Sequence, residues 1–157
     1  MTFILSSSSF RHQGPIPRRN TGQGEDLSPP LSWSGIPQGA ESLALVIRDP
    51  DVPDPDAPER TWIHWIVLNL PPVAARLTQG VDPLDLPNGS RLGWNDWQRT
   101  RYGGPMPPRG RHRYIHTLYA LDLVLPGHGP LTEPQLCTAM DGHVLETALL
   151  VGTYEQN

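Results

Sequence analysis

Prolines and glycines interrupt this chain at short intervals along its length. Of its 157 residues, 19 are proline and 15 are glycine. Proline removes a main-chain donor and breaks helix interiors, and glycine weakens helices and strands alike. The pattern therefore favours many short strands joined by ordered loops and argues against a helical bundle.

Three segments have the composition of strands. Residues 42–47 (SLALVI) form an apolar run between a glycine and Asp49-Pro50, as expected of a buried strand. Residues 112–125 are rich in strand-forming tyrosine, isoleucine, threonine and valine. Residues 62–70 are largely apolar on both faces, as in the interior of a sandwich.

A regular strand over residues 62–70 would place successive side chains on opposite faces. One face would carry Ile63, Trp65 and Val67. The other face would carry Trp62, His64, Ile66 and Leu68.

The C-terminal region predicts one short helix and a further element. Thr132 is a candidate N-cap, and Gln135 completes a capping box. Leu136 and Met140 would form the inward face of this helix. Residues 144–154 suit either a helix or a strand, and their Gly-Thr-Tyr ending favours a closing strand. Because strands outnumber helices, we expect an all-β sandwich with one short α-helix near the C-terminus.

Length, charge and cysteine content set further limits. A chain of this length is expected to form one domain over residues 1–157. Cys137 is the only cysteine, which excludes an internal disulfide or a thiolate metal cluster, and we expect it to be a packed small side chain. The net charge of −4 argues against a nucleic-acid partner.

The N-terminus MTFILSSSSF has no positively charged region typical of a signal peptide. No stretch approaches the ~20 apolar residues of a transmembrane helix. These features predict a cytoplasmic protein without a transmembrane segment.

The stretch RDPDVPDPDAPERTWIHW, residues 48–65, is crowded with carboxylates. Its spacing does not suit an EF-hand calcium loop, because Pro53 and Arg60 occupy positions that should supply ligands. We expect Asp54, Asp56 and Glu59 to face solvent and Asp51 to brace the turn. Asp49 directly follows a buried strand, which places it at the rim of the core.

The stretch HRYIH, residues 112–116, could supply half of a zinc site only on a helix. In a strand, His112 and His116 would lie ~13 Å apart, too far to share one ion. A strand does bring His112 and Tyr114 together on one face, ~7 Å apart. A zinc site would therefore need His64 from another strand.

The loop YGGPMPPRG, residues 102–110, admits two interpretations. It is either an ordinary turn or an anion-binding loop, because glycines allow close approach of main-chain N–H groups and prolines stiffen the chain. Five arginines surround this loop, and they indicate either surface solubility or a positively charged interaction surface. They are Arg99, Arg101, Arg109, Arg111 and Arg113.

The sequence offers no convincing catalytic nucleophile, because no G-x-S-x-G elbow is present. Several ordered motifs instead resemble the phosphatidylethanolamine-binding protein family, and in particular its short prokaryotic (YbhB/YbcL-like) branch. The motifs are LSPPLSW, DPDVP, WIHW, GWND, YGGPMPP, GRHRY and GHVLETALLVGTY.

This resemblance implies a Greek-key-like β-sandwich with a small preformed pocket for phosphate or other phosphoryl-type anions. It implies a non-catalytic binding protein without a cofactor or a metal, in some cases a homodimer. The ligand-binding residues carried over from the motifs are Asp49, Pro53, Trp62, His64, Gly104, Pro107, Pro108, His112 and Tyr114. We expect protonated His64 and His112 to hold the anion, with binding that weakens above about pH 7.5.

Two alternatives remain open on the sequence. The family also contains kinase and protease inhibitors, for which the Arg99–Arg113 region would be the contact surface. A metal-dependent hydrolase would use His64, His112 and an aspartate. Three departures from the family pattern are an aromatic-free loop DPDAPERT, the absence of a C-terminal helix after the final strand, and His116, to which no role is assigned.

Overall fold

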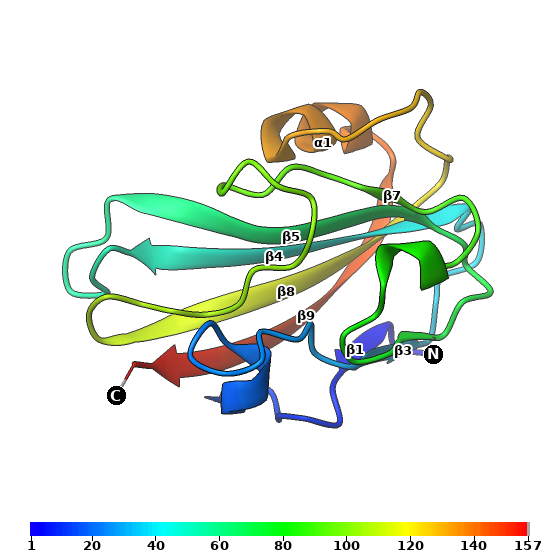
Figure 1. The fold of residues 1–157 in the computed structure, drawn as a ribbon. Helices are drawn as coiled ribbons and strands as arrows, with labels where there is room; N and C mark the ends of the chain where they lie inside the picture. Colours follow the sequence, from blue (N-terminus) through cyan, green and yellow to red (C-terminus); the bar gives the residue numbers. More distant parts are fainter. Residues whose placement is uncertain (157) are drawn as a thin grey trace.

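The computed structural model describes residues 1–156 and contains two β-sheets with a helix on the outer face of the larger one (Figure 1). The smaller sheet has the strand order β1-β3-β6, with β1 at Ile4–Ser6, β3 at Leu31–Ser34 and β6 at Arg76–Leu77. The larger sheet has the order β2-β9-β8-β4-β5-β7. Its strands are β2 (Gly14–Pro15), β4 (Ser42–Val52), β5 (Arg60–Leu70), β7 (Arg91–Leu92), β8 (Arg111–Leu121) and β9 (Val144–Glu155).

The helical elements are short. The α-helix α1 spans Glu133–Met140, and two 3₁₀ turns occupy Arg18–Asn20 and Pro83–Asp85. The expected all-β sandwich with one short helix near the C-terminus is therefore confirmed. No helix in residues 1–156 is both long and apolar enough to cross a membrane.

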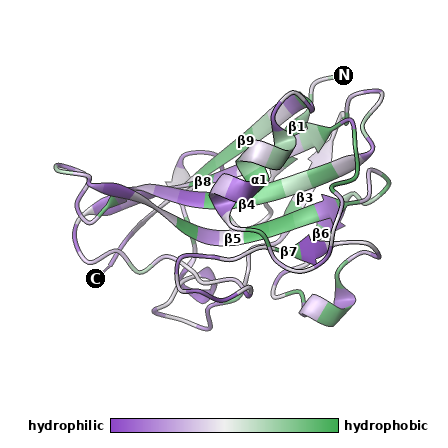
Figure 2. Cartoon of the chain, turned by 90° about the horizontal axis from the view of Figure 1, so that it is seen from above, coloured by the Kyte–Doolittle hydropathy of each residue, from purple (hydrophilic) through white to green (hydrophobic). Residues whose placement is uncertain are grey.

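Two apolar clusters hold these layers together. The first lies between the two sheets and includes Leu45 and Leu118, both fully buried. The second lies between α1 and the outer face of the larger sheet and includes Val46, Ile66 and Leu136. Burying one such side chain contributes about 1.5–3 kcal/mol, so the central strands β4, β5 and β8 are stabilised from both faces. Figure 2 shows the hydrophobic stretches along β5 and β9.

Strand β4 extends beyond its predicted end at residue 47, to Val52. The reason is tertiary, because the carboxylates after this point have partners on β8. Asp49 contacts His112, and Asp51 pairs with Arg113. A run that looks like a polar loop in the sequence is therefore largely an ordered strand end.

The predicted division of β5 into two regular faces is wrong at Ile63. This residue packs with Ile66 in the cluster beneath α1, whereas Trp65 packs between the sheets. The cause is a register shift in the pairing with β4, where Ile47 is opposite Trp65 but Arg48 is opposite Ile63. Such a bulge reverses the alternation of side chains on either side of it.

Strand β9 confirms the preferred interpretation of residues 144–154, and it pairs antiparallel with β8 along its length. Strand β8 stops at Leu121, short of the predicted residue 125. The chain turns there, with the Asp122 N–H donating to the carbonyl of His143.

Helix α1 has the predicted capping box between Thr132 and Gln135. Its inward residues Leu136 and Met140 are buried, as expected from their spacing. The expectation that Cys137 is packed is wrong, because this thiol is exposed. One residue after Leu136, the helix has turned by about 100°, which takes Cys137 off the buried face of the helix. Its Sγ lies 4.0 Å from Nη2 of Arg48.

Candidate functional site

A cavity of about 200 Å³ lies where β4, β5 and β8 meet the loop that precedes β8. Seven of the nine residues predicted for the ligand site line it, namely Asp49, Trp62, His64, Pro107, Pro108, His112 and Tyr114. Pro53 and Gly104 are not among its lining residues. Val52, Trp97 and Met106 also line it and are absent from the sequence-based set.

Asp49 and His112 form a buried pair on the wall made by β4 and β8. The Oδ2 of Asp49 lies 2.6 Å from Nδ1 of His112, and the Nε2 of His112 lies 2.8 Å from the carbonyl oxygen of Arg109. A carbonyl can only accept, so Nε2 carries a hydrogen. The other oxygen of Asp49 accepts from the N–H of Asp51 at 2.8 Å. Both polar groups are therefore held in place by the protein itself.

The imidazole of His112 offsets the negative charge of the Asp49 carboxylate. Burial raises the pKa of Asp49, and the hydrogen bond from His112 opposes that rise. A proton lies between Asp49 Oδ2 and His112 Nδ1, and the carboxylate is compensated by the imidazole. The wall adds little net charge to the cavity.

His64 comes from β5 and has a different environment. Its Nδ1 donates to the carbonyl oxygen of Gly103 at 2.7 Å, because that oxygen can only accept. Burial lowers the pKa of His64 to about 4, so the ring is neutral at pH 7 and Nε2 holds an acceptor lone pair. Nε2 has no hydrogen-bond partner within residues 1–156. The rings of Trp97 and Tyr114 meet the imidazole edge-on, with centroids at 5.0 and 5.2 Å.

Two buried donors in the cavity wall lack acceptors. They are the indole Nε1 of Trp62 and the hydroxyl of Tyr114. Burial raises the pKa of Tyr114, and the nearby Asp49 carboxylate raises it further, so the hydroxyl stays protonated. That hydroxyl has no partner in good hydrogen-bonding geometry, although the Asp49 carboxylate is close enough to raise its pKa both through its charge and through a side-chain hydrogen bond outside that geometry. An unpaired buried donor costs about 1–3 kcal/mol.

The glycine–proline loop contributes shape more than hydrogen bonds. The N–H of Gly103 donates to the carbonyl of His64 at 3.3 Å, and the N–H of Gly104 donates to Oδ1 of Asp26 at 2.8 Å. Of the two interpretations of this loop, the ordinary turn is favoured at Gly103 and Gly104, because both N–H groups already have acceptors within the protein. Gly104 is needed for packing, since a Cβ there would lie 2.5 Å from the carbonyl oxygen of Asn20.

Trp97 is the most informative residue missing from the sequence-based set. Its ring lies edge-on to both His64 and Trp62, at centroid distances of 5.0 and 5.5 Å. The side chain of Asn95 accepts from the N–H groups of Trp97 and Arg99 and so shapes this loop. A tryptophan in a polar loop, within GWNDW, is the signal that marks this position.

The arginines around the loop are exposed and do not line the cavity. Arg113 makes a two-point contact with Asp51, at 2.8 and 3.0 Å. Arg111 pairs with Glu155 at 3.4 Å, and Arg99 lies over the ring of Trp97. Asp51 thus braces β4 against β8, and the pKa of its carboxyl is lowered mainly by the Arg113 hydrogen bond.

His116 lies apart from the cavity and is fully buried. Its Nδ1 donates towards the carbonyls of Tyr114 and Leu150, at 2.9 and 3.2 Å. Its ring packs against Phe10 with centroids 5.4 Å apart. This residue ties β8 to β9 and to the N-terminal segment, which is a structural role.

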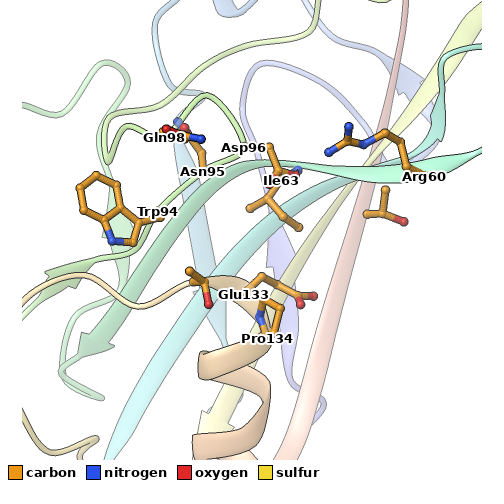
Figure 3. Close-up of a pocket in the computed structure, with 10 residues that line it drawn as sticks. Arg60, Ile63, Trp94, Asn95, Asp96, Gln98, Glu133 and Pro134 are labelled. Atoms are coloured by element: carbon orange, nitrogen blue, oxygen red, sulfur yellow. The ribbon is translucent and has the colours of Figure 1, made fainter.

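A larger cavity of about 1020 Å³ lies between α1, β5 and the loop after β7 (Figure 3). None of the residues predicted for the ligand site lines it. Its carboxylates are already engaged, because Asp96 accepts from the N–H of Ile63 and Glu133 pairs with Arg48. Unpaired polar atoms instead occur in the smaller cavity, which makes the smaller cavity the candidate site.

The described residues provide no set of side chains that could bind a metal ion. No group of three or more His, Cys, Asp or Glu side chains in residues 1–156 is placed to hold an ion. His64 uses Nδ1 on Gly103, and both nitrogens of His112 have partners. The hydrolase hypothesis therefore gains no support from this geometry.

Comparison with known proteins agrees with the fold. A protein from Methanothermobacter thermautotrophicus, described as a UPF0098 protein, is 45% identical over 153 residues, which cover 97% of this chain and 98% of the relative. The crystal structure of a phosphatidylethanolamine-binding protein homolog from Chlamydia trachomatis is 42% identical, with a TM-score of 0.90 and 99% of each chain covered. YbcL of Escherichia coli, described as a new member of the mammalian family, is 27% identical over the full length of both chains, with a TM-score of 0.88. The model of the phosphatidylethanolamine-binding protein family matches residues 6–155, and this chain is a member of that family.

Proposed function

We propose that this protein binds, without catalysis, a small phosphoryl-type oxyanion that carries one proton. The observation that carries the proposal is the set of unpaired groups in the smaller cavity. Trp62 and Tyr114 present donors without acceptors, and His64 presents an acceptor without a donor. A monoprotonated phosphoryl group satisfies all three, because its oxygens accept and its P–OH donates.

The electrostatics of the cavity favour the monoprotonated ligand over the fully ionised one. His64 is neutral, and the Asp49 carboxylate is balanced by His112. A second negative charge would therefore meet no additional cation in the wall. The expected pair of protonated histidines is thus replaced by a model in which the ligand brings the proton to Nε2 of His64.

The size of the cavity limits the ligand. A volume of about 200 Å³ lies below the ~300–1,000 Å³ of sites for drug-sized molecules. A phosphoryl group with a short substituent fills this volume, and any larger substituent would project out of the cavity. Family membership supports a binding protein in general terms.

Titration calorimetry with methyl phosphate, repeated from pH 5 to 8.5, tests the proposal. The second pKa of a phosphomonoester is ~6, so we expect affinity to fall about tenfold per pH unit above that value. Sulfate carries no proton in this range, so it should bind more weakly and without that pH dependence. Affinity that rises with pH, or that is equal for sulfate, would contradict the model.

Variants locate the site. Tyr114→Phe and Trp62→Phe each remove one donor while keeping the ring, and each should weaken methyl phosphate by about tenfold or more. Tyr119→Phe is the matched control, because Tyr119 lies on the outer face beside Arg48. Equal losses in all three variants would place the anion elsewhere.

A further inference from the structure

The larger cavity lies on the other side of the wall that bounds the candidate anion site. Successive residues of the loop after β7 face opposite ways, so that Trp97 lines the smaller cavity whereas Asp96 and Gln98 line the larger one. A volume of about 1020 Å³ is at the upper end of the ~300–1,000 Å³ of sites for small organic molecules. The proposed function uses none of the residues that line this cavity, so it is free to hold a second, separate ligand.

Two carboxylates form the central part of the larger cavity, Asp96 from the loop and Glu133 from α1 (Figure 3). Oδ2 of Asp96 accepts from the N–H of Ile63 at 2.7 Å, and Oε2 of Glu133 pairs with Arg48 at 3.0 Å. Glu133 also interacts with the Cys137 thiol. These contacts fix both carboxylates without saturating them, because a carboxylate has about four acceptor positions. The charge of Glu133 is offset by Arg48, whereas Asp96 is bonded to a neutral N–H group and keeps its negative charge uncompensated.

The two ends of the larger cavity differ in character. At one end is the guanidinium of Arg60, which lies over the ring of Trp62, 4.7 Å from its centroid, and forms no ion pair in residues 1–156. At the other end is Trp94, which is 41% exposed (Figure 3). Ile63 and Pro134 add apolar surface. A ligand that lies along this cavity therefore meets an aromatic ring, then carboxylates, then a cation.

Strand β5 presents main-chain groups to the same space at Thr61. The N–H and the carbonyl of Ile63 point away from β4, since both bond to Asp96. The alternation of a strand directs those of Thr61 the same way, and Thr61 lines the cavity. On the β4 side, the register shift at this point offers no donor, because Pro50 has no N–H and the N–H of Asp51 donates to a side-chain carboxylate. The carbonyl of Thr61 is therefore an acceptor for a ligand.

We infer that the larger cavity binds a dipeptide whose first side chain is apolar. Its α-ammonium donates to Asp96 and Glu133, and its first side chain packs on Trp94. Its amide N–H donates to the carbonyl of Thr61, and its carboxylate pairs with Arg60. The charges match, because Asp96 and Arg60 balance each other and a dipeptide has no net charge at neutral pH. A simple amine would leave Arg60 without a partner, and a simple anion would leave Asp96 without one.

Titration calorimetry with the dipeptide Phe-Gly at pH 7 tests the inference, with one analogue for each contact. N-acetyl-Phe-Gly lacks the ammonium, Phe-Gly amide lacks the carboxylate, and Gly-Gly lacks the apolar side chain. We expect a single site for Phe-Gly and binding of each analogue that is weaker by about tenfold or more. Absence of Phe-Gly binding, or equal affinity for all four compounds, would overturn the inference.

Two substitutions test whether the dipeptide lies in the larger cavity. Asp96→Asn should remove the preference for Phe-Gly over its N-acetyl form, and Arg60→Gln should remove the preference over the amide. Asp85→Asn and Arg76→Gln are the matched controls, because both residues are exposed and lie outside the cavity, and both variants should bind as wild type does. Thermal unfolding checks that each variant is folded, and Arg60 is itself exposed. Preferences that stay unchanged in Asp96→Asn and Arg60→Gln would contradict the inference.

Competition separates this site from the candidate anion site. Excess methyl phosphate should not displace Phe-Gly, since the two cavities share no lining residue. Displacement would place the dipeptide carboxylate in the smaller cavity and would refute the inference. The two substitutions decide the matter on their own if methyl phosphate does not bind, so failure of the anion proposal is distinguishable from failure of this one.

Discussion

At the scale of single residues, two buried histidines have the same charge state for different purposes. Burial lowers the pKa of both His64 and His116 to about 4. His116 has its Nδ1 bonded to main-chain carbonyls and its ring packed on Phe10. His64 instead leaves Nε2 open beside the cavity. Burial alone therefore does not mark a functional histidine, and the unpaired atom does.

The lowered pKa values of these two histidines predict how the free energy of unfolding depends on pH. In the unfolded chain a histidine binds a proton near pH 6.5, whereas in the folded state each of these two does so only near pH 4. The unfolded state thus binds more protons between these values, and stability falls as the pH drops through that window. The loss should reach about 3 kcal/mol per histidine below pH 4.

Urea unfolding at several pH values between 7 and 4 measures this effect. His116→Phe removes one of the two groups and should show a clearly shallower loss of stability on acidification. Asp49, whose pKa is raised, works in the opposite direction but is the same in both proteins. Parallel curves for wild type and variant would show that His116 does not stay neutral in the folded state.

Removal of the Tyr114 hydroxyl should raise the stability of the ligand-free protein and lower its affinity for the anion. Tyr114→Phe removes a buried donor that has no good acceptor, so the ligand-free protein should become more stable by about 1 kcal/mol. The same variant should lose affinity for methyl phosphate. Tyr119→Phe is the comparison, and it should lower stability slightly, because the Tyr119 hydroxyl interacts with Arg48. Clear destabilisation by Tyr114→Phe would show that the hydroxyl has a partner in the free protein.

At the scale of elements, the packing of α1 against the larger sheet can be tested with a single substitution. Leu136 is fully buried between the helix and the outer face of the larger sheet. Leu136→Ala should cost about 2–5 kcal/mol, because it removes buried apolar surface and leaves a cavity. Thr138→Ala, at an exposed position of the same helix, should change stability by no more than about 0.5 kcal/mol. Thermal or urea unfolding measures both, and equal effects would mean that α1 is not anchored through Leu136.

The polar residues that line the candidate site lie near the ends of strands. Asp49 lies near the end of β4, His64 near the start of β5, and His112 at the start of β8. Their adjacency follows from the strand order, in which β4 lies between β5 and β8. The loop with Trp97 and the two prolines closes the cavity above them.

At the scale of the whole molecule, ligand binding should appear as added stability. A ligand that binds only the folded state at a concentration of 100 times its Kd stabilises by about 2.7 kcal/mol. For a chain of this size that corresponds to a rise in Tm of about 5–10 °C. Differential scanning fluorimetry with methyl phosphate at pH 6 should show this rise in wild type and a much smaller one in Tyr114→Phe. No rise at saturating ligand would contradict specific binding to the native state.

Local patterns in the sequence determined most of the elements. Apolar runs located β4, β5 and β8, and the Thr132–Gln135 capping box located α1, because strand alternation and helix capping act over a few residues. The ordered motifs also indicated the family and seven residues that line one cavity. All of these features depend on neighbours in the chain.

The tertiary structure decided what depends on distant partners. The bulge in β5 set the face of Ile63, and burial set the protonation of His64. The N–H of Gly104, which one interpretation of its loop assigns to an anion, donates to Asp26, which is far away in the sequence. Desolvation and hydrogen bonding are fixed by whatever packs around a group, so the free donors and acceptors of the cavity emerge only once the chain is folded.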